Sequence, residues 1–331
     1  MEKFIDDPAE LVDDLLEGLA LVMADYVNVI GHTVVRKGLQ DEAPKVTSVT
    51  MGGAGHEPSS LGFLGRGWEC VKVIGDIFAA PSAVAVADAI RLANKGRGVL
   101  LYVGNHDGDV LSAKLALKLL KRDGIPVELV ILRDDISFFD RAHRQDRRGM
   151  AGSLILGRVI GAACESGYSL QEVKRVAEDC VTRTATLSAA SRGATHPVNG
   201  FPISRITPGK MVIGMGQHGE GQGREEPMQP AREVIRRMAD RLCADLELQA
   251  GDKVSVTLNG TGSTTYMELL VLYRDTVEYF QARGITISAK LVGEYLTTQE
   301  QAGFQLSCMK LNEELRTLLD APCHTFFVHR G

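Results

Sequence analysis

Residues 99–122 read VLLYVGNHDGDVLSAKLALKLLKR and contain three successive patterns. The first five residues are apolar, which is typical of a buried strand. A polar, glycine-rich loop follows at residues 104–109, and residues 112–122 have the amphipathic spacing of a helix. A strand that leads through a short loop into a helix is the repeating unit of α/β proteins.

The same alternation recurs along most of the chain and predicts an α/β fold. We expect two α/β domains whose mainly parallel or mixed sheets are doubly wound and flanked by helices. Several expected helices end in a basic residue before a glycine, as at Lys95-Gly96 and Arg283-Gly284, which is typical of a helix C-terminus. The expected strands are residues 46–51, 71–74, 99–103, 127–132, 211–215, 254–258, 286–292 and 304–310. The expected helices are residues 82–93, 112–122, 150–164, 232–245 and 266–283.

The chain has 331 residues, about twice the length of a typical domain. Within residues 185–205, a helical stretch is expected to run out into SRGATHPVNG at 191–200, a composition typical of a linker or loop. We therefore expect an N-terminal domain over residues 1–190 and a C-terminal domain over residues 191–331, each with its own sheet.

Charge and hydropathy argue against several classes of protein. The net charge of -5 argues against a general nucleic-acid-binding protein, because no domain-wide basic face is available to neutralise phosphates. We interpret the local basic run at Arg141, Arg144, Arg147 and Arg148 as a solvated loop or helix face. No stretch of about 18 uncharged apolar residues occurs, so no membrane span is expected.

The cysteines and the first residues indicate a cytoplasmic protein. The six cysteines are widely scattered and none forms a CxxC pair, so we expect neither paired zinc ligands nor disulfides. Cys164 and Cys308 lie among apolar residues, which indicates reduced thiols in the core. The opening residues MEKFIDD are too acidic and contain too few apolar residues for a signal peptide.

Three glycine-rich loops that follow or end expected strands concentrate the titratable residues. They span residues 51–58, 104–109 and 214–220, and each contains a histidine: His56, His106 or His218. Glycines let a backbone approach a ligand closely, and ligands of open α/β sheets bind beyond the carboxyl ends of strands. The three loops therefore predict a small-molecule site.

Each polar loop residue also has a purely structural interpretation. A loop histidine can cap a helix or bond a carbonyl. Asp107 and Asp109 can cap the following helix, and for Asp107 we favour capping or a solvated position. We interpret Glu57 and Glu220 as residues that stabilise their own loops. For Asp109 the capping interpretation is less convincing, because its loop is expected at the same edge as the loops of His56 and His218.

Recognisable nucleotide and metal motifs are absent from the sequence. Residues 62–67, GFLGRG, do not have the Gly-x-Gly-x-x-Gly spacing, and no Gly-x4-Gly-Lys-Ser/Thr occurs. The pair His56-Glu57 lacks the second histidine of a metalloprotease helix. We expect no metal site and no nucleotide cofactor on this chain.

Taken in order, the motifs resemble the substrate-binding, K-type subunit of dihydroxyacetone (glycerone) kinases. The resemblance spans nearly the whole chain, and its segments together are highly specific. They are GGAGHEP at 52–58, GDIFAAPS at 75–82, NHDGD at 105–109, RRGMAG at 147–152, GMGQHGE at 214–220, NGTG at 259–262 and DAP at 320–322.

The resemblance implies a two-domain subunit that forms a homodimer and binds a short ketose such as dihydroxyacetone. It implies that His218 attacks the ketone carbon to form a hemiaminal, that His56 and Asp109 contact the bound sugar and assist the chemistry, and that backbone at Gly53 and Gly55 contributes to the substrate pocket. Our hypothesis is that His56 donates a hydrogen bond to the carbonyl oxygen and that Asp109 is the general base. A neutral imidazole, with an unperturbed pKa of about 6.5, has the free lone pair that such an attack needs.

The resemblance also implies a second protein. ATP or ADP with Mg is expected on a partner L-type subunit, which is either ATP-dependent or recharged by a phosphoprotein of the phosphoenolpyruvate–sugar phosphotransferase system. Since glycerol has no carbonyl, covalent anchoring would select ketoses against it.

Several loop residues depart from the family pattern. The family usually has a glycine at Met51, often a hydroxyl residue at Ala80, an aromatic-plus-small pair at residues 106–107 and Pro-Gly directly after Glu220. These departures leave dihydroxyacetone, a tetrulose such as erythrulose and a branched pentulose open as substrates. A different alternative is a non-catalytic ketose sensor that acts as coactivator of a transcription regulator. Asp109 favours catalysis, because a sensor needs no base.

Overall fold

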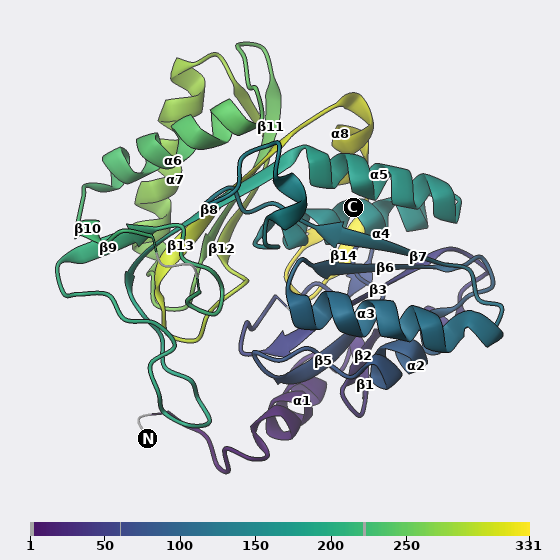
Figure 1. Ribbon diagram of the computed structural model, residues 1–331. Helices are drawn as coiled ribbons and strands as arrows, with labels where there is room; N and C mark the ends of the chain where they lie inside the picture. The colour runs from purple at the N-terminus through teal and green to yellow at the C-terminus, as the bar shows by residue number, and fades with distance from the viewer. Residues whose placement is uncertain (1–2, 60, 221–222) are drawn as a thin grey trace.

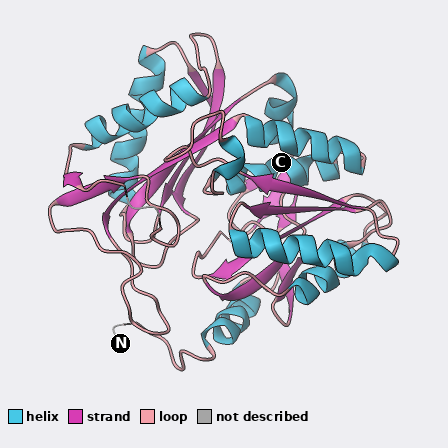
Figure 2. Cartoon of the chain, viewed as in Figure 1, coloured by secondary structure: helices cyan, strands magenta, loops and turns pink. Residues whose placement is uncertain are grey.

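The computed structural model describes residues 3–59, 61–220 and 223–331. Two six-stranded sheets form the centres of two lobes, and helices cover their faces (Figures 1 and 2). The expected α/β class is confirmed, and every expected strand and helix coincides with an observed one. A third sheet joins β4 (Gly65–Arg66) to two short strands near the C-terminus, β14 (Cys323–Thr325) and β15 (His329–Arg330).

The first sheet has the strand order β1-β2-β5-β3-β6-β7. Its last four strands are parallel, as expected, while β1 and β2 form an antiparallel hairpin at one edge. The strands are β1 (Val27–Ile30), β2 (Thr33–Arg36), β3 (Thr47–Ala54), β5 (Val71–Ile77), β6 (Val99–Gly104) and β7 (Val127–Leu132). The helices of this half are α1 (Leu11–Val22), α2 (Ala83–Ala93), α3 (Asp107–Leu119), α4 (Gly152–Glu165) and α5 (Leu170–Thr182). Short 3-10 turns are η1 (Leu39–Asp41), η2 (Leu120–Arg122) and η3 (Arg144–Asp146).

The second sheet has the order β10-β9-β8-β13-β11-β12, and only β11 and β12 are parallel. This sheet is therefore mixed, which is one of the two arrangements expected from the sequence. For example, β13 pairs with β8 although the two strands are far apart in the sequence, and the two run antiparallel. The strands are β8 (Thr184–Arg192), β9 (Lys210–Ile213), β10 (Glu226–Pro227), β11 (Lys253–Gly260), β12 (Thr286–Glu294) and β13 (Ala302–Lys310). The helices are α6 (Ala231–Asp245), α7 (Tyr266–Ala282) and α8 (Glu313–Asp320).

Strand β8 occupies the segment in which we expected a helix to run out into a loop. Helix α5 ends at Thr182, and β8 pairs with β13 along its whole length. The expected boundary between residues 190 and 191 stays a prediction; position 190 lies inside β8, which belongs to the second sheet.

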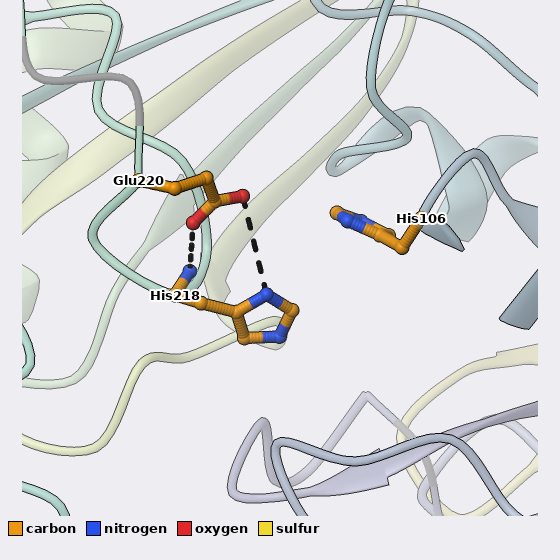
Figure 3. Close-up of side chains that lie close together, drawn as sticks. All are labelled: His106, His218 and Glu220. Carbon is orange, nitrogen blue, oxygen red and sulfur yellow. Dashed lines mark hydrogen bonds and ion pairs between the residues drawn. The ribbon is translucent and has the colours of Figure 1, made fainter. Parts of the chain in front are cut away.

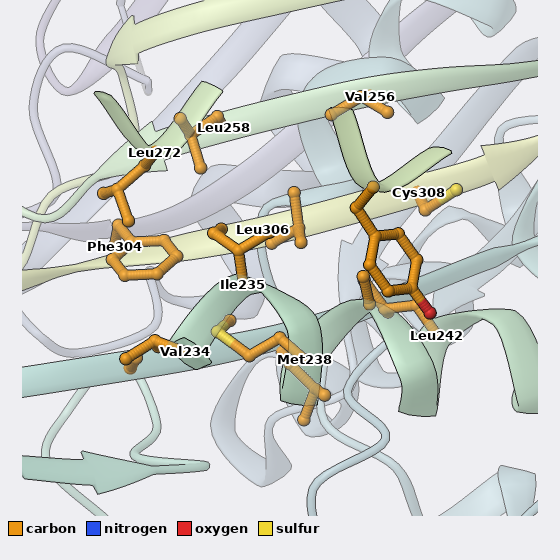
Figure 4. Close-up of a cluster of buried hydrophobic side chains, with 14 of the residues drawn as sticks. Val234, Ile235, Met238, Leu242, Val256, Leu258, Leu272, Phe304, Leu306 and Cys308 are labelled. Atoms are coloured by element: carbon orange, nitrogen blue, oxygen red, sulfur yellow. The ribbon is translucent and has the colours of Figure 1, made fainter. Parts of the chain in front are cut away.

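Helices α6 and α7 bury their apolar faces against the second sheet. Ile235 and Met238 of α6 pack in one buried cluster with Val256 of β11 and Leu306 of β13 (Figure 4). Burying a side chain of this size contributes about 1.5–3 kcal/mol to folding. This cluster is the core of the second lobe.

Helix α4 lies in the interior and touches both lobes. None of its residues is exposed, and its side chains are apolar on nearly all sides, as is typical of a buried helix. It packs with β6 and β7 of the first sheet and also with α5 and α8. Gly161 permits the closest approach, since a Cβ there would lie 2.0 Å from the Trp68 carbonyl oxygen.

Asp134 joins the end of β7, the start of α4 and strand β8. Its fully buried carboxylate accepts hydrogen bonds from the Met150 amide at 2.7 Å and the Gly152 amide at 2.9 Å. It also accepts from the Thr186 hydroxyl of β8, while the Thr186 amide donates to the Asp134 carbonyl at 2.7 Å. A carboxylate at a helix N-terminus satisfies amides that have no partner inside the helix.

The solvated interpretation of the basic run is wrong for Arg147 and Arg148. Arg147 is 0% exposed and pairs with Asp245 of α6, and Arg148 is mostly buried against Asp135. A guanidinium enters the interior when carboxylates and carbonyls can satisfy its donors, which the sequence pattern alone does not reveal.

The cysteines in the structure are free, and Cys164 and Cys308 are buried, as expected. None of the helices described is both long and apolar enough to cross a bilayer.

Asp134→Ala should lower the free energy of unfolding by about 3 kcal/mol, because three buried donors lose a charged acceptor. Urea unfolding followed by circular dichroism measures this change. The matched control is Asp25→Ala, an exposed aspartate in the turn after α1, for which we expect a change below about 0.5 kcal/mol. Equal effects of the two substitutions would contradict the structural role of Asp134.

Candidate active site

The three histidine loops meet at one cavity of about 540 Å³ between the lobes. His56 comes from the loop after β3, Asp109 from the start of α3 after β6, and His218 from the loop after β9. All three side chains line the cavity, as does Gly53. The structure therefore brings together residues that are far apart in the sequence, although their chemical roles stay predictions.

The two site histidines are in direct contact. His56 is 7% exposed, and its Nδ1 lies 2.7 Å from the Thr297 carbonyl oxygen, while its Nε2 lies 3.0 Å from Nε2 of His218. A carbonyl oxygen only accepts, so Nδ1 of His56 carries the proton and Nε2 of a neutral His56 has the lone pair. It follows that His218 donates from its own Nε2 in this arrangement.

Both imidazoles are uncharged at neutral pH. Burial, together with the neighbouring His218, lowers the pKa of His56 to about 3. Burial likewise lowers the pKa of His218 to about 4, an effect that the Glu220 carboxylate opposes. A neutral pair is the state in which nitrogen can attack a carbonyl.

Glu220 and Arg148 hold the loop that carries His218. The Glu220 carboxylate accepts from the His218 amide at 2.7 Å. The Arg148 guanidinium donates to the carbonyls of Gly214 at 3.1 Å and Glu220 at 3.0 Å, so it fixes both ends of the loop. Glu57 accepts from the Gly55 amide at 3.0 Å, so the loop-stabilising interpretation of both glutamates is confirmed.

Asp109 lies in the first turn of α3 and is half-buried, whereas Asp107 is exposed. Burial raises the pKa of Asp109 to about 6, against the opposing effects of His106 and Lys72. Neither aspartate is the N-cap of α3, because that position belongs to His106. The pKa of the Asp109 carboxyl group thus lies close to neutral pH, the range that general acid–base catalysis favours.

The glycines of the first loop fit tightly against the segment after β5. A Cβ at Gly53 would lie 2.6 Å from the Ala79 amide nitrogen. Gly55 has a φ of +104°, and a Cβ there would lie 2.7 Å from the ring of Phe78. Phe78 itself has a φ of 56°, which is strained for a residue with a side chain. Its ring lies 5.1 Å from that of His56 and 5.5 Å from that of His218, so it packs against both.

Residues 295–301, after β12, support both histidine loops and were not singled out from the sequence. The Thr297 hydroxyl donates to the Glu57 carbonyl at 2.6 Å, and the Thr298 hydroxyl donates to the Gln217 carbonyl at 2.8 Å. This segment has no glycine or histidine signature. Hydroxyl-to-backbone bonds between segments so distant in sequence leave no local pattern that could predict them.

Among the residues that the structure describes, His106, His218 and Glu220 form a group with potential metal-ligand atoms within 4.8 Å of one another (Figure 3). His106 donates from Nε2 to the Gly149 carbonyl at 3.0 Å, which leaves its Nδ1 lone pair free. Zinc bonds of about 2.0–2.2 Å require ligand atoms roughly 3.5 Å apart, so these side chains would have to approach one another. The expectation that this chain has no metal site stays a prediction.

The departure from the family pattern that follows Glu220 falls on residues 221–222, which lie outside the described residues. Of the other departures, Met51, Ala80, His106 and Asp107 all line the cavity.

The chain is similar to proteins of known activity over its whole length. The family model described as Dak1 domain matches residues 17–327. The dihydroxyacetone-binding subunit DhaK of PTS-dependent dihydroxyacetone kinase 1 from Listeria innocua is 35% identical over 314 residues, 95% of each chain. The L-erythrulose kinase of Pectobacterium atrosepticum is 36% identical over 100% of this chain and 57% of its own length.

A solved structure gives the same result. The dihydroxyacetone kinase from C. freundii in complex with AMP-PNP and Mg2+ has a TM-score of 0.87 and 30% identity. The match covers 99% of this chain and 61% of that one, so the C. freundii enzyme contains a large additional part. The resemblance stated from the sequence motifs is confirmed: this chain belongs to the dihydroxyacetone kinase family and carries its Dak1 domain.

Proposed function

We propose that this chain is the ketose-binding subunit of a dihydroxyacetone-type kinase and holds its substrate as a hemiaminal on His218. The observation that carries the proposal is the contact of two neutral imidazoles, His218 and His56, in a cavity that Asp109 also lines. Names of relatives support the same class of reaction, since they include dihydroxyacetone and erythrulose kinases.

Formation of the hemiaminal uses His56 as the proton carrier. The Nε2 proton of His218 passes to Nε2 of His56, and the freed lone pair on His218 bonds to the ketone carbon. The π electrons of the carbonyl move to its oxygen, which takes the proton back from His56. The product is neutral, and neither imidazole keeps a charge that burial would disfavour.

Asp109 then acts on a terminal hydroxyl of the anchored ketose. Its carboxylate accepts the hydroxyl proton as that oxygen attacks the γ-phosphate of a nucleotide. A positioned base of this kind contributes about 10²–10⁴-fold to the rate. The covalent bond keeps the sugar in one orientation, which lowers the entropic part of the barrier.

We further propose that the nucleotide, ATP or ADP with Mg, is bound by a partner L-type subunit. Two observations support this: the C. freundii kinase, crystallised with AMP-PNP and Mg2+, is longer than this chain, and the Listeria relative is named as a subunit of a PTS-dependent enzyme. A phosphoprotein of the phosphotransferase system is then a candidate phosphoryl donor, and a homodimer is the assembly that the family resemblance implies.

A non-catalytic ketose sensor remains the alternative with the same sugar-capturing histidine. Asp109 favours the kinase, because burial gives its carboxylate a pKa of about 6 in the wall of the cavity. Capture of a sugar without phosphoryl transfer does not require such a base. Phosphorylation of a ketose by the complex with a cognate nucleotide-binding subunit distinguishes the two.

His218→Ala should abolish ketose capture by the isolated chain, because the attacking nitrogen is lost. With dihydroxyacetone labelled with ¹³C at the ketone carbon, NMR should show a protein-bound tetrahedral carbon signal, distinct from that of the hydrated free sugar, for the unmodified protein and none for the variant. His143→Ala, at an exposed histidine outside the cavity, is the matched control and should leave the signal unchanged. Persistence of the tetrahedral signal in His218→Ala would disprove the covalent anchor.

Turnover and capture should have different pH dependences. The active form of Asp109 is the carboxylate, which predominates above its pKa of about 6, so turnover should fall about tenfold per pH unit below that value. Ketose capture should persist to lower pH, since the pKa of His218 is about 4 and its neutral form is the one that reacts. Steady-state kinetics with a nucleotide-binding subunit, compared with isothermal titration calorimetry, measures the separation.

Asp109→Asn should retain ketose capture and lower turnover at pH 7 by at least about 10²-fold. Asp107→Asn is the control and should leave the fall in turnover below pH 6 unchanged. If capture and turnover were lost together at one pH, Asp109 would not be the base.

A further inference from the structure

A row of polar side chains lies in the cavity wall beneath His56 and Asp109, and the proposed mechanism does not use it. Thr50 of β3 is paired in register with Lys72 of β5 on one side and with Tyr102 of β6 on the other. All three side chains are buried and line the cavity. Side chains at matching positions of adjacent strands share a face, so this row forms a continuous polar strip on the sheet.

Lys72 and Glu69 are the charged members of this wall, and both are more than nine-tenths buried, at 7% and 5% exposed. The Tyr102 hydroxyl donates to Oε1 of Glu69 at 2.6 Å, but Oε2 of Glu69 has no partner. Within the described part of the chain, no carboxylate oxygen lies within 4.0 Å of Nζ of Lys72, and no side chain or backbone group hydrogen-bonds to it. Two residues of the cavity lining thus offer a donor and an acceptor that do not satisfy each other.

Buried polar groups without partners are costly to a fold, and they persist where a ligand supplies the partner. The ammonium of Lys72 offers three donors and no acceptor, while Oε2 of Glu69 offers lone pairs and, when ionised, no donor. A hydroxyl group can accept from the first and donate to the second. The missing partner therefore has the chemistry of a hydroxyl.

The local charge excludes an anionic group as that partner. Lys72 is the cation near three carboxyl groups, those of Glu69, Glu57 and Asp109, all close enough to influence its ionisation. Each of these carboxyl groups, when ionised, would repel a carboxylate or phosphate on the ligand. A neutral, hydroxylated carbon chain fits this arrangement.

We propose that Lys72 and Glu69 form a hydroxyl-binding subsite that selects ketoses of four or more carbons over dihydroxyacetone. The inference rests on the proposed function, because it places the sugar on His218. In an anchored triose, the new hemiaminal hydroxyl hydrogen-bonds to His56, and one terminal hydroxyl hydrogen-bonds to Asp109. A single hydroxyl then remains, which satisfies only one of the three Lys72 donors.

A four-carbon ketose adds a neighbouring hydroxyl, so that a vicinal pair spans the ammonium and the carboxylate. The cavity volume of about 540 Å³ leaves room for the longer chain. The relatives include an L-erythrulose kinase that is 36% identical over the whole of this chain.

Calorimetric binding to the isolated full chain tests the subsite, with dihydroxyacetone, L-erythrulose and D-erythrulose as probes. We expect at least one erythrulose to bind about tenfold more tightly than dihydroxyacetone. Lys72→Met should weaken erythrulose binding by about tenfold to a hundredfold, and dihydroxyacetone binding by less than about threefold. Lys114→Met, at an exposed lysine of α3, is the matched control and should change neither affinity.

Glu69→Gln, which keeps the shape of the side chain, gives a second and independent measurement and decides the result if Lys72→Met does not fold. It should weaken erythrulose binding by about threefold to tenfold and dihydroxyacetone binding less. Equal losses for both sugars, or tighter binding of dihydroxyacetone by the unmodified chain, would overturn the subsite. Binding of no ketose, or binding that survives His218→Ala, would instead overturn the proposed function.

Discussion

The buried carboxylate of Asp134 is the interaction on which the arrangement of the two lobes depends. It accepts from the Met150 amide before α4, from the first amide of α4 and from a hydroxyl of β8, so that the end of the first sheet, the central helix and the second sheet share one acceptor. The histidine loops leave these same sheets. Their meeting at one cavity is therefore a consequence of how the lobes are joined and not of any local sequence preference.

Burial, more than pairing, sets the chemistry of the cavity. The same loss of solvent that lowers the pKa of both histidines raises that of Asp109. His218 and His56, the proposed nucleophile and proton carrier, stay neutral, and the pKa of Asp109, the proposed base, is brought closer to neutral pH. A single physical cause thus produces opposite shifts in bases and acids, as a site for covalent capture followed by proton abstraction requires.

The sequence was sufficient for the elements that have a strong apolar pattern and for the polar loops that follow them. It predicted the parallel strands of the first sheet and the placing of His56, Asp109 and His218 near one another. It could not predict β8, because alanine, serine and threonine carry no strand-like apolar pattern. The sequence also did not reveal the buried or supporting positions of Arg147, Thr297 and Lys72. The segments that surround these side chains are far away in the chain.

The origin of the site residues in different lobes has a mechanical consequence. A sugar bonded to His218 in the second lobe and hydrogen-bonded to Asp109 in the first would be a reversible cross-link between them. Protein with bound sugar should then resist proteolysis at the lobe junction better than empty protein, because the sugar would hold the two lobes together as well as serve as substrate.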